Sequence, residues 1–256
     1  NYMSVGLVLP PNNISPATET GHTFAMLMLQ KGMNYYNGEQ TASTFDSVEA
    51  VQSFEEWTDF YTKYSFEQTY DAFSRFRTGE YPIVIANYTF FNQLTAASPE
   101  INGLWDFCPV PATARADGTL SHGANSNGAG AIIFNKVKNK ENAWKFVKWF
   151  TDTDTQVQYA AQIEGLLGTM GRFDTANVEA LGQLSWSKDE LSRLRAQQNE
   201  LAEIPVTPAS YAVTRNIMNA FRETINEQKN PRDTLIWYNR DINDEITRKR
   251  RNLGLE

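Results

Sequence analysis

The sequence predicts a helix-rich α/β fold, and three observations indicate it. Apolar residues recur three and four positions apart in several long stretches, as they do in amphipathic helices. Short runs of branched apolar residues, of which 83–86 is the clearest, are typical of strands buried on both faces. Glycine and proline clusters separate these stretches and indicate loops between the predicted helices and strands.

The first third of the chain predicts a strand followed by two helices. Residues 4–9 are the candidate strand, which the prolines of 10–16 end, and residues 22–36 are the first helix. Ser47 is a favourable N-cap for a second helix of about 16 residues. Its apolar stripe is predicted to lie in the core and consists of Ala50, Val51, Phe54, Trp57, Phe60 and Tyr61.

The central stretch, 73–111, is where the sequence first indicates a site. Phe73 and Phe76 share one face of a short helix, and Gly79 ends this helix as a left-handed cap does. The strand 83–86 follows, and polar and aromatic side chains together fill 87–92. Because ligands of open α/β sheets bind beyond the carboxyl ends of the strands, we expect a ligand near 87–92.

The remaining elements alternate loops with helices. A polar loop, 112–130, leads into a predicted strand, 131–134, and then a helix, 138–161. Further helices are predicted near 175–184 and 188–203, over 211–228 after a stiff loop with two prolines, and from 230 onward. The apolar residues expected to face inward from the helix 138–161 are Ala143, Trp144, Phe146, Val147, Trp149 and Phe150.

Composition and charge exclude several classes of function. At 256 residues the chain suffices for one large or two modest domains, and its net charge of -7 argues against nucleic acid or an anionic membrane as its main partner. No apolar run approaches the roughly 18 residues of a membrane helix. The chain does not begin with Met and shows no signal peptide, so we expect a processed or trimmed chain.

The single cysteine and two histidines leave little room for metal or redox chemistry. Cys108 alone cannot form an intrachain disulfide or a cysteine-based zinc site, and its apolar neighbours predict a buried, unreactive thiol. The histidines lie a hundred residues apart, which argues against a histidine metal site. We therefore expect no metal and no cofactor.

Several motifs, in this order along the chain, resemble one known family. Residues 76–88 read Phe-x-x-Gly-Glu-x-Pro-Ile-x-Ile-Ala-Asn-Tyr, and 105–111 read Trp-Asp-Phe-x-Pro-Val-Pro. Residues 143–151 read Ala-Trp-x-Phe-x-Lys-Trp-Phe-Thr, and 204–211 read Ile-Pro-x-x-Pro-Ala-x-Tyr. Ala209 stands where the family usually has glycine. Together these motifs resemble the extracellular solute-binding proteins of ABC importers, in their carbohydrate-binding branch.

The resemblance implies a periplasmic-binding-protein-like fold of type II, with two lobes joined by crossover strands. Residues 1–125 and 205–256 would build a C-terminal-type lobe, and 126–204 would be the remaining part of the other lobe. The N-terminal lobe would be incomplete, so that the chain resembles the C-terminal portion of such a protein. The polar run before residue 131 would line the cleft between the lobes.

The resemblance also implies what the protein binds and where. Aromatic faces and planar hydrogen-bonding groups suit the C–H faces and hydroxyl rims of a sugar. Arg172 could instead brace its own loop, and each aromatic ring could instead pack in the core. The candidate ligand-binding residues are Asn87, Tyr88, Phe91, Trp105, Asn125, Asn127, Arg172, Tyr211 and Arg215.

The implied partners are a carbohydrate ligand and the permease of an ABC importer. No nucleic acid is expected, and contact with a membrane would come only through an anchor or the permease. The implied location is extracellular, either at the bacterial cell surface as an anchored lipoprotein or in the periplasm. The resemblance implies a binding protein and not an enzyme.

Two alternatives stay open at this point. One is a cell-surface glycan-binding or scaffold domain without a transport role. The other is a glycoside-active enzyme, which needs two carboxylates near each other. Any chain with 30 acidic residues could place two of them together, so their number does not indicate such an enzyme. Asp117, Ser121 and His122 do not make a convincing triad, because no nucleophile elbow surrounds the serine.

Overall fold

A computed structural model describes residues 7–8, 23–68, 71–126 and 130–255. The chain divides into two compact units, and both are built from separate stretches of sequence. Unit 1 contains residues 1–85, 109–127 and 197–256, and unit 2 contains residues 86–108 and 128–196. The assignment of 1–125 with 205–256 and of 126–204 to the lobes of a two-lobed fold stays a prediction.

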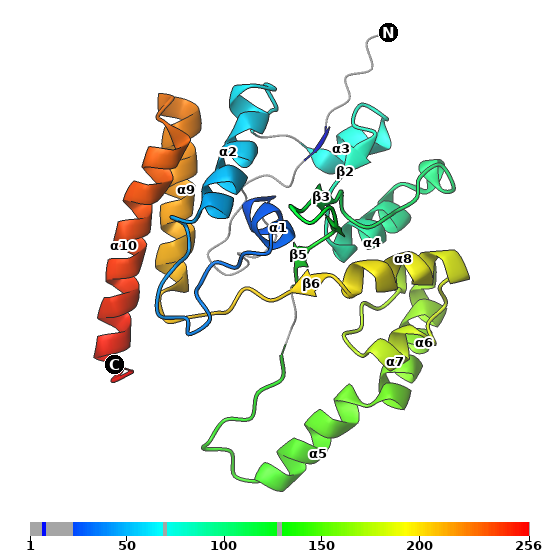
Figure 1. Ribbon diagram of the computed structural model, residues 1–256. Coiled ribbons are helices and arrows are strands. Elements are labelled where there is room, and N and C mark those ends of the chain that lie inside the picture. Colours follow the sequence, from blue (N-terminus) through cyan, green and yellow to red (C-terminus); the bar gives the residue numbers. More distant parts are fainter. Residues whose placement is uncertain (1–6, 9–22, 69–70, 127–129, 256) are drawn as a thin grey trace. The chain divides into compact units, whose positions relative to one another are not determined.

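Unit 1 contains the two longest helices and all the strands of the described residues. Its helices are α1 (Thr23–Gln30), α2 (Val48–Thr62), α3 (Ala72–Arg77), α9 (Ser210–Glu227) and α10 (Pro231–Asn252). Its strands are β1 (Leu7–Val8), β2 (Ile83–Val84), β3 (Thr113–Ala114), β4 (Leu120–Ser121), β5 (Ala124–Asn125) and β6 (Leu201–Ala202). Figure 1 shows α9 and α10 running side by side along the edge of this unit.

The core of unit 1 forms where α1 and α2 meet the α9–α10 pair. The Trp57 indole stacks on Phe221 with ring centroids 4.1 Å apart, and Phe24 stacks on the same indole at 5.8 Å. All three side chains are buried. Large aromatic rings bury much apolar surface each, so these three rings contribute strongly to the hydrophobic stabilisation of the unit.

The helix ends of unit 1 follow the predicted signals. Ser47 caps α2 by accepting a hydrogen bond from the backbone N–H of Ala50, and Asn230 caps α10 in the same way through Asp233. Gly79 has a φ of 75° just after α3, the left-handed conformation that glycine allows. The first helix is shorter than predicted because the chain turns at Gly32, where φ is 81°.

The strands are shorter and less covered than the sequence predicts. β1 pairs with β2 in parallel, β5 with β6 in parallel, and β3 with β4 antiparallel, each pair two residues long. The expectation that 83–86 is buried on both faces was wrong, because Ile83 is 49% exposed. The part of the N-terminal strand prediction outside residues 7–8 lies outside the described residues.

Unit 2 consists of helices and turns in its described part. It contains α4 (Tyr88–Ala97), η1 (Pro99–Ile101), α5 (Lys140–Thr151), α6 (Thr153–Leu167), η2 (Gly168–Gly171) and α7 (Val178–Leu181). Helix α8 (Lys188–Gln198) begins in unit 2, and its last two residues belong to unit 1. None of the helices in the described ranges is long and apolar enough to cross a membrane.

Three predictions about unit 2 were wrong. The stretch 131–134 is not a strand, and Ile132 and Phe134 are each 74% exposed. The single helix predicted over 138–161 is two helices, because Asp152 ends α5 and caps the first turn of α6. Cys108 is exposed and not buried, since no part of the described chain covers it.

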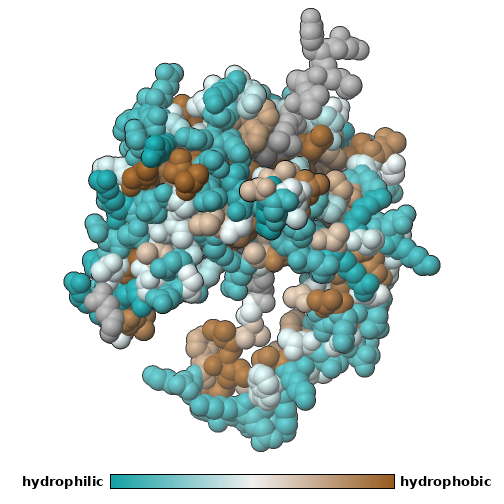
Figure 2. Space-filling view, in the orientation of Figure 1, coloured by the Kyte–Doolittle hydropathy of each residue, from teal (hydrophilic) through white to brown (hydrophobic). Residues whose placement is uncertain are grey.

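The apolar side of α5 is a surface and not a core face. Trp144, Phe146 and Trp149 are between 57% and 61% exposed, and Phe150 is 39% exposed. Figure 2 shows apolar side chains at the surface in the region of α5. The spacing of these residues correctly indicates one apolar stripe, but the described residues of unit 2 do not cover it.

Candidate functional site

The predicted site residues of unit 2 meet in one cluster of aromatic rings. Asn87 is the N-cap residue of α4, and Tyr88 and Phe91 occupy the first turn of this helix. The Phe91 ring lies 5.8 Å from that of Tyr88 and 5.5 Å from that of Trp105, between ring centroids. The ligand was predicted beyond the end of a strand. The residues at that place form the N-terminus of α4, the element that follows β2 in the chain.

Two further aromatic residues complete this cluster. The Trp186 ring lies 5.2 Å from Phe91 and 6.1 Å from Tyr88, and Phe107 lies 6.0 Å from Trp186. Most of these contacts are edge-to-face or tilted, as aromatic pairs prefer. We call the five residues Tyr88, Phe91, Trp105, Phe107 and Trp186 the aromatic cluster.

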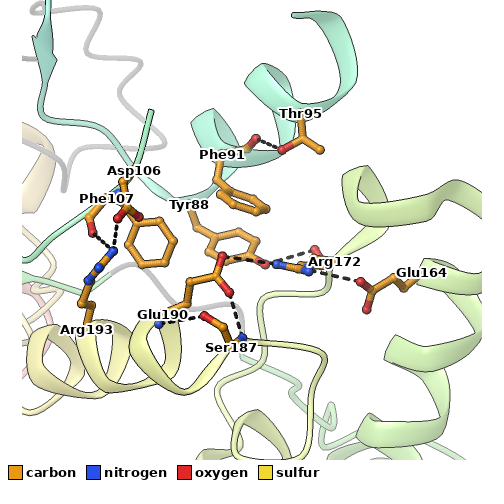
Figure 3. A network of polar contacts seen from close by, with 10 residues as sticks. All are labelled: Tyr88, Phe91, Thr95, Asp106, Phe107, Glu164, Arg172, Ser187, Glu190 and Arg193. Carbon is orange, nitrogen blue, oxygen red and sulfur yellow. Dashed lines mark hydrogen bonds and ion pairs between the residues drawn. The ribbon is translucent and has the colours of Figure 1, made fainter. Parts of the chain in front are cut away.

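Arg172 joins the aromatic cluster to two carboxylates (Figure 3). Its Nε donates to Glu164 Oε1 at 3.1 Å, and its Nη1 lies 3.8 Å from Glu190 Oε1. The guanidinium lies 4.5 Å from the Trp186 ring centroid, within the range of a cation–π contact. This geometry favours Arg172 as a brace of its own loop, one of the two roles expected from the sequence.

The backbone of Arg172 holds the first turns of α4. Tyr88 OH and Asn92 Nδ2 each donate to the Arg172 carbonyl at 3.3 Å. Burial raises the pKa of the Tyr88 hydroxyl, and the charge of Asp174 raises it further. Tyr88 is therefore neutral at physiological pH and able to donate a hydrogen bond.

Three buried polar atoms in or beside the predicted site have no hydrogen-bond partner among the described residues. They are Oδ1 of Asn92, Nε1 of Trp186 and, in unit 1, Nδ2 of Asn125. An unpaired buried donor or acceptor costs about 1–3 kcal/mol. A water molecule or a ligand hydroxyl near these atoms would remove that cost.

The remaining predicted site residues belong to unit 1, whereas the aromatic cluster belongs to unit 2. Tyr211 and Arg215 lie one turn apart on α9, and the Arg215 guanidinium is 5.9 Å from the Tyr211 ring centroid. Tyr211 OH donates to Glu245, and Lys249 Nζ lies 5.3 Å from the same ring. Asn125 lies in β5, and Asn127 lies outside the described residues.

The Tyr211 contacts shift the acidity of Glu245. Hydrogen bonds from Arg248 first, and from Tyr211 second, lower the pKa of Glu245 to about 2. Tyr211 is 43% exposed, so its ring still has free surface. Its hydroxyl and ring already have partners within unit 1, and a ligand would have to compete with them.

A separate cavity of about 490 Å³ lies in unit 1. Its lining includes Arg115, Ser121 and Glu200, and the predicted site residues do not line it. No group of three or more His, Cys, Asp or Glu side chains with a metal-binding arrangement occurs within the described part of the chain.

The sequence-based prediction missed Trp186, Phe107 and Glu190. A signal for two of them exists, because Ser187-x-x-Glu190 is a capping box and Trp186 precedes it directly. The structure contains this box, with Ser187 N donating to Glu190 Oε2 at 2.8 Å and Glu190 N donating to Ser187 Oγ at 3.2 Å. The box fixes where α8 begins, and with it the position of Trp186.

Comparison with a collection of protein families gives one match. Residues 8–182 match the model of the family described as bacterial extracellular solute-binding protein. No curated protein matches the sequence. The match covers all of the first stretch of unit 2, its second stretch as far as residue 182, and much of unit 1.

Comparison with solved structures finds sugar-binding proteins at low sequence identity. The sugar-binding protein MalE of Xanthomonas citri is 13% identical with a TM-score of 0.75. That match covers all of this chain and 62% of the Xanthomonas protein. A solute-binding protein of Thermotoga lettingae TMO bound with α-D-tagatose is 18% identical with a TM-score of 0.69. The cyclic α-maltosyl-1,6-maltose binding protein of Arthrobacter globiformis is 17% identical with a TM-score of 0.70.

These likenesses confirm the predicted fold. For the Thermotoga and Arthrobacter proteins, the match covers 95% of this chain and 60% of theirs. The chain therefore spans about three fifths of the length of the solved structures that it matches. The fold is the helix-rich α/β fold of the periplasmic-binding-protein-like type II class.

Proposed function

This chain belongs to the bacterial extracellular solute-binding proteins, and from this premise we propose that it serves as the substrate-binding component of an ABC importer. The ligand is a sugar or an oligosaccharide, captured in the cleft between the lobes of this fold. The function is capture and release, with no bond made or broken. The protein acts outside the cytoplasm, in the periplasm or anchored as a lipoprotein, and its partner is the importer permease.

The family match over residues 8–182 is the observation that carries this proposal. The matched structures support the ligand class: the Thermotoga protein is bound with α-D-tagatose, the Arthrobacter protein is a cyclic α-maltosyl-1,6-maltose binding protein, and a matched MalE domain of Bdellovibrio bacteriovorus is bound to maltotriose. In this chain, Tyr88 offers what a sugar needs: a half-buried ring for C–H stacking and a neutral hydroxyl. We propose that the ligand contacts unit 2 at Tyr88 and its neighbours in the aromatic cluster.

A thermal-shift series tests the proposal. The complete gene product is heated with D-tagatose, maltotriose and cyclic maltosyl-maltose, one at a time. A ligand that binds only the native state stabilises it by about 2.7 kcal/mol at a hundredfold excess over its dissociation constant. We expect one of these sugars, or a close relative, to raise the melting temperature of the wild-type protein.

The matched variants are Tyr88→Ala and Tyr64→Ala. Both remove a tyrosine ring, but Tyr64 follows α2 and is 66% exposed. The proposed site requires that Tyr88→Ala loses the sugar-dependent shift while Tyr64→Ala keeps it. Equal shifts in both variants would remove Tyr88 from the site.

A further inference from the structure

The chain passes between the two units at four points, and three of them are tied together within unit 1. The passages follow residues 85, 108, 127 and 196. The stretches 109–113, 121–126 and 197–202 lie in unit 1 next to the last three of these passages. We call them the crossing segments.

The side-chain amide of Gln197 bonds the other two crossing segments at once. The backbone N–H of Val110 donates to Gln197 Oε1 at 2.8 Å, and Gln197 Nε2 donates to the carbonyl of His122 at 3.0 Å. The His122 Nδ1 atom lies 2.5 Å from the Val110 carbonyl oxygen and closes the ring. One residue from each segment thus takes part in a single closed hydrogen-bonded ring.

A second set of bonds joins the later two crossing segments. The Glu200 carboxylate accepts from the backbone N–H of His122 at 3.0 Å. β5 pairs in parallel with β6, and Ser126 N donates to the carbonyl of Ala202 at 2.9 Å. The amides of His122 and Ser126 therefore report on this pairing without themselves contacting the Gln197 side chain.

The end of α1 anchors the crossing segments to the core of unit 1. The buried Gln30 side chain donates from Nε2 to the Pro111 carbonyl at 2.8 Å and accepts from Thr113 Oγ1 at 2.6 Å. Gly123 approaches the same turn so closely that an added Cβ would lie 3.2 Å from Gln30 N. The segments thus rest on a buried helix end that cannot shift easily.

We propose that Gln197 is a positioning residue that couples the three crossing segments, so that they are ordered and released together. This inference rests on the proposed function, because Asn125, a predicted ligand-binding residue, lies in one of these segments. Without the Gln197 amide, 109–113 would lose its side-chain bond to 197–202, and the paired segments that hold Asn125 in β5 would lose the bond from Gln197 to His122. Gln197 acts through the backbone and need not touch the ligand.

Amide hydrogen exchange of the ligand-free protein tests the coupling, which separates its outcome from that of sugar binding. In Gln197→Ala we expect exchange to accelerate by about tenfold or more at Val110, and also at His122 and Ser126. The last two amides keep their own partners, Glu200 and Ala202, so only coupling would accelerate them. Acceleration at Val110 alone would overturn the proposal.

Two further variants keep the test sharp. Gln156→Ala also removes a glutamine amide with two hydrogen bonds, to the Phe150 carbonyl and from Thr175 Oγ1, but within unit 2. It should leave exchange at His122 and Ser126 unchanged, and an equal acceleration there would mean general destabilisation and sink the proposal. Gln197→Glu keeps the acceptor for Val110 but loses the donor to His122, so coupling predicts faster exchange at Val110 as well as at His122 and Ser126, and acceleration that spares Val110 would contradict the proposal.

Discussion

The guanidinium of Arg172 lies over the ring of Trp186, 4.5 Å from its centroid, while its Nε donates to Glu164. These contacts link α6 and the end of η2, which follow each other directly in the chain, to the start of α8. The side chains of Arg172 and Glu164 are only 16% and 19% exposed. Solvent therefore screens this ion pair less than it screens the surface pairs of the chain.

Arg172→Ala should destabilise the protein by about 2 kcal/mol, because it leaves the partly buried Glu164 carboxylate without its cation. The measurement is urea unfolding, and Arg193→Ala is the control. Arg193 pairs with Asp106, but these side chains are 35% and 63% exposed, so the control should cost less than about 1 kcal/mol. Equal losses in the two variants would contradict a structural role special to Arg172.

Tyr88→Phe should cost about 1 kcal/mol of unfolding free energy, because it removes the hydroxyl that donates to the Arg172 carbonyl and keeps the ring. The same variant tests whether a sugar is bound through stacking or through the hydroxyl. If stacking carries binding, calorimetric affinity for the bound sugar stays close to that of the wild type. A loss as large as that of Tyr88→Ala would assign binding to the hydroxyl instead.

Trp57→Ala should destabilise the protein by about 3–5 kcal/mol, because it empties the centre of the unit 1 core beside Phe221 and Phe24. Trp237 on α10 provides a matched control, since it is 54% exposed. Its replacement by alanine should change stability by about 0.5 kcal/mol or less. Chemical unfolding compares them, and a similar cost at both positions would place the core elsewhere.

Glu245 should make the free energy of unfolding depend on pH over a defined acidic range. Its pKa falls from an ordinary 4.5 to about 2 in the folded protein, so the folded state binds fewer protons than the unfolded state between these values. Its contribution is fully present above about pH 5 and is lost as pH falls through about 2. The stability difference between wild type and Glu245→Gln, followed by urea unfolding from pH 6 to 2, should shrink over this window; a constant difference would refute the depressed pKa.

The apolar surface of α5 predicts a different response to substitution. Trp149 is 57% exposed, so Trp149→Ser should change the unfolding free energy by about 0.5 kcal/mol or less. The same change should reduce binding of an apolar fluorescent dye, because it removes part of an exposed apolar patch. A loss of several kcal/mol would show instead that this side chain is buried in solution.

Local signals in the sequence predicted most of the helices of unit 1. Ser47 and Asn230 mark helix starts because their side chains replace missing intrahelical partners, and Gly79 marks an end through its positive φ. Such signals act over three or four residues, so the sequence contains them completely. The failures at Ile132 and Trp144 have another cause, since periodicity identifies an apolar face but not the element that covers it.

The aromatic cluster was predictable only as far as its residues are close in the chain. Tyr88 and Phe91 lie on one helix turn, and Trp105 lies near them in sequence, so the motif pointed to all three. Trp186 lies nearly a hundred residues later, and only tertiary packing brings it to Phe91. The roles of Asn125, Tyr211 and Arg215 in ligand binding stay predictions.

Isothermal titration of the complete gene product with maltotriose, D-tagatose and cyclic maltosyl-maltose tests the central claim most directly. The proposed function predicts saturable binding of at least one of these sugars or a close relative, and no heat of binding in Tyr88→Ala. A wild-type protein that is folded, as its cooperative unfolding would show, yet binds no sugar across an oligosaccharide panel at millimolar concentration would contradict carbohydrate capture.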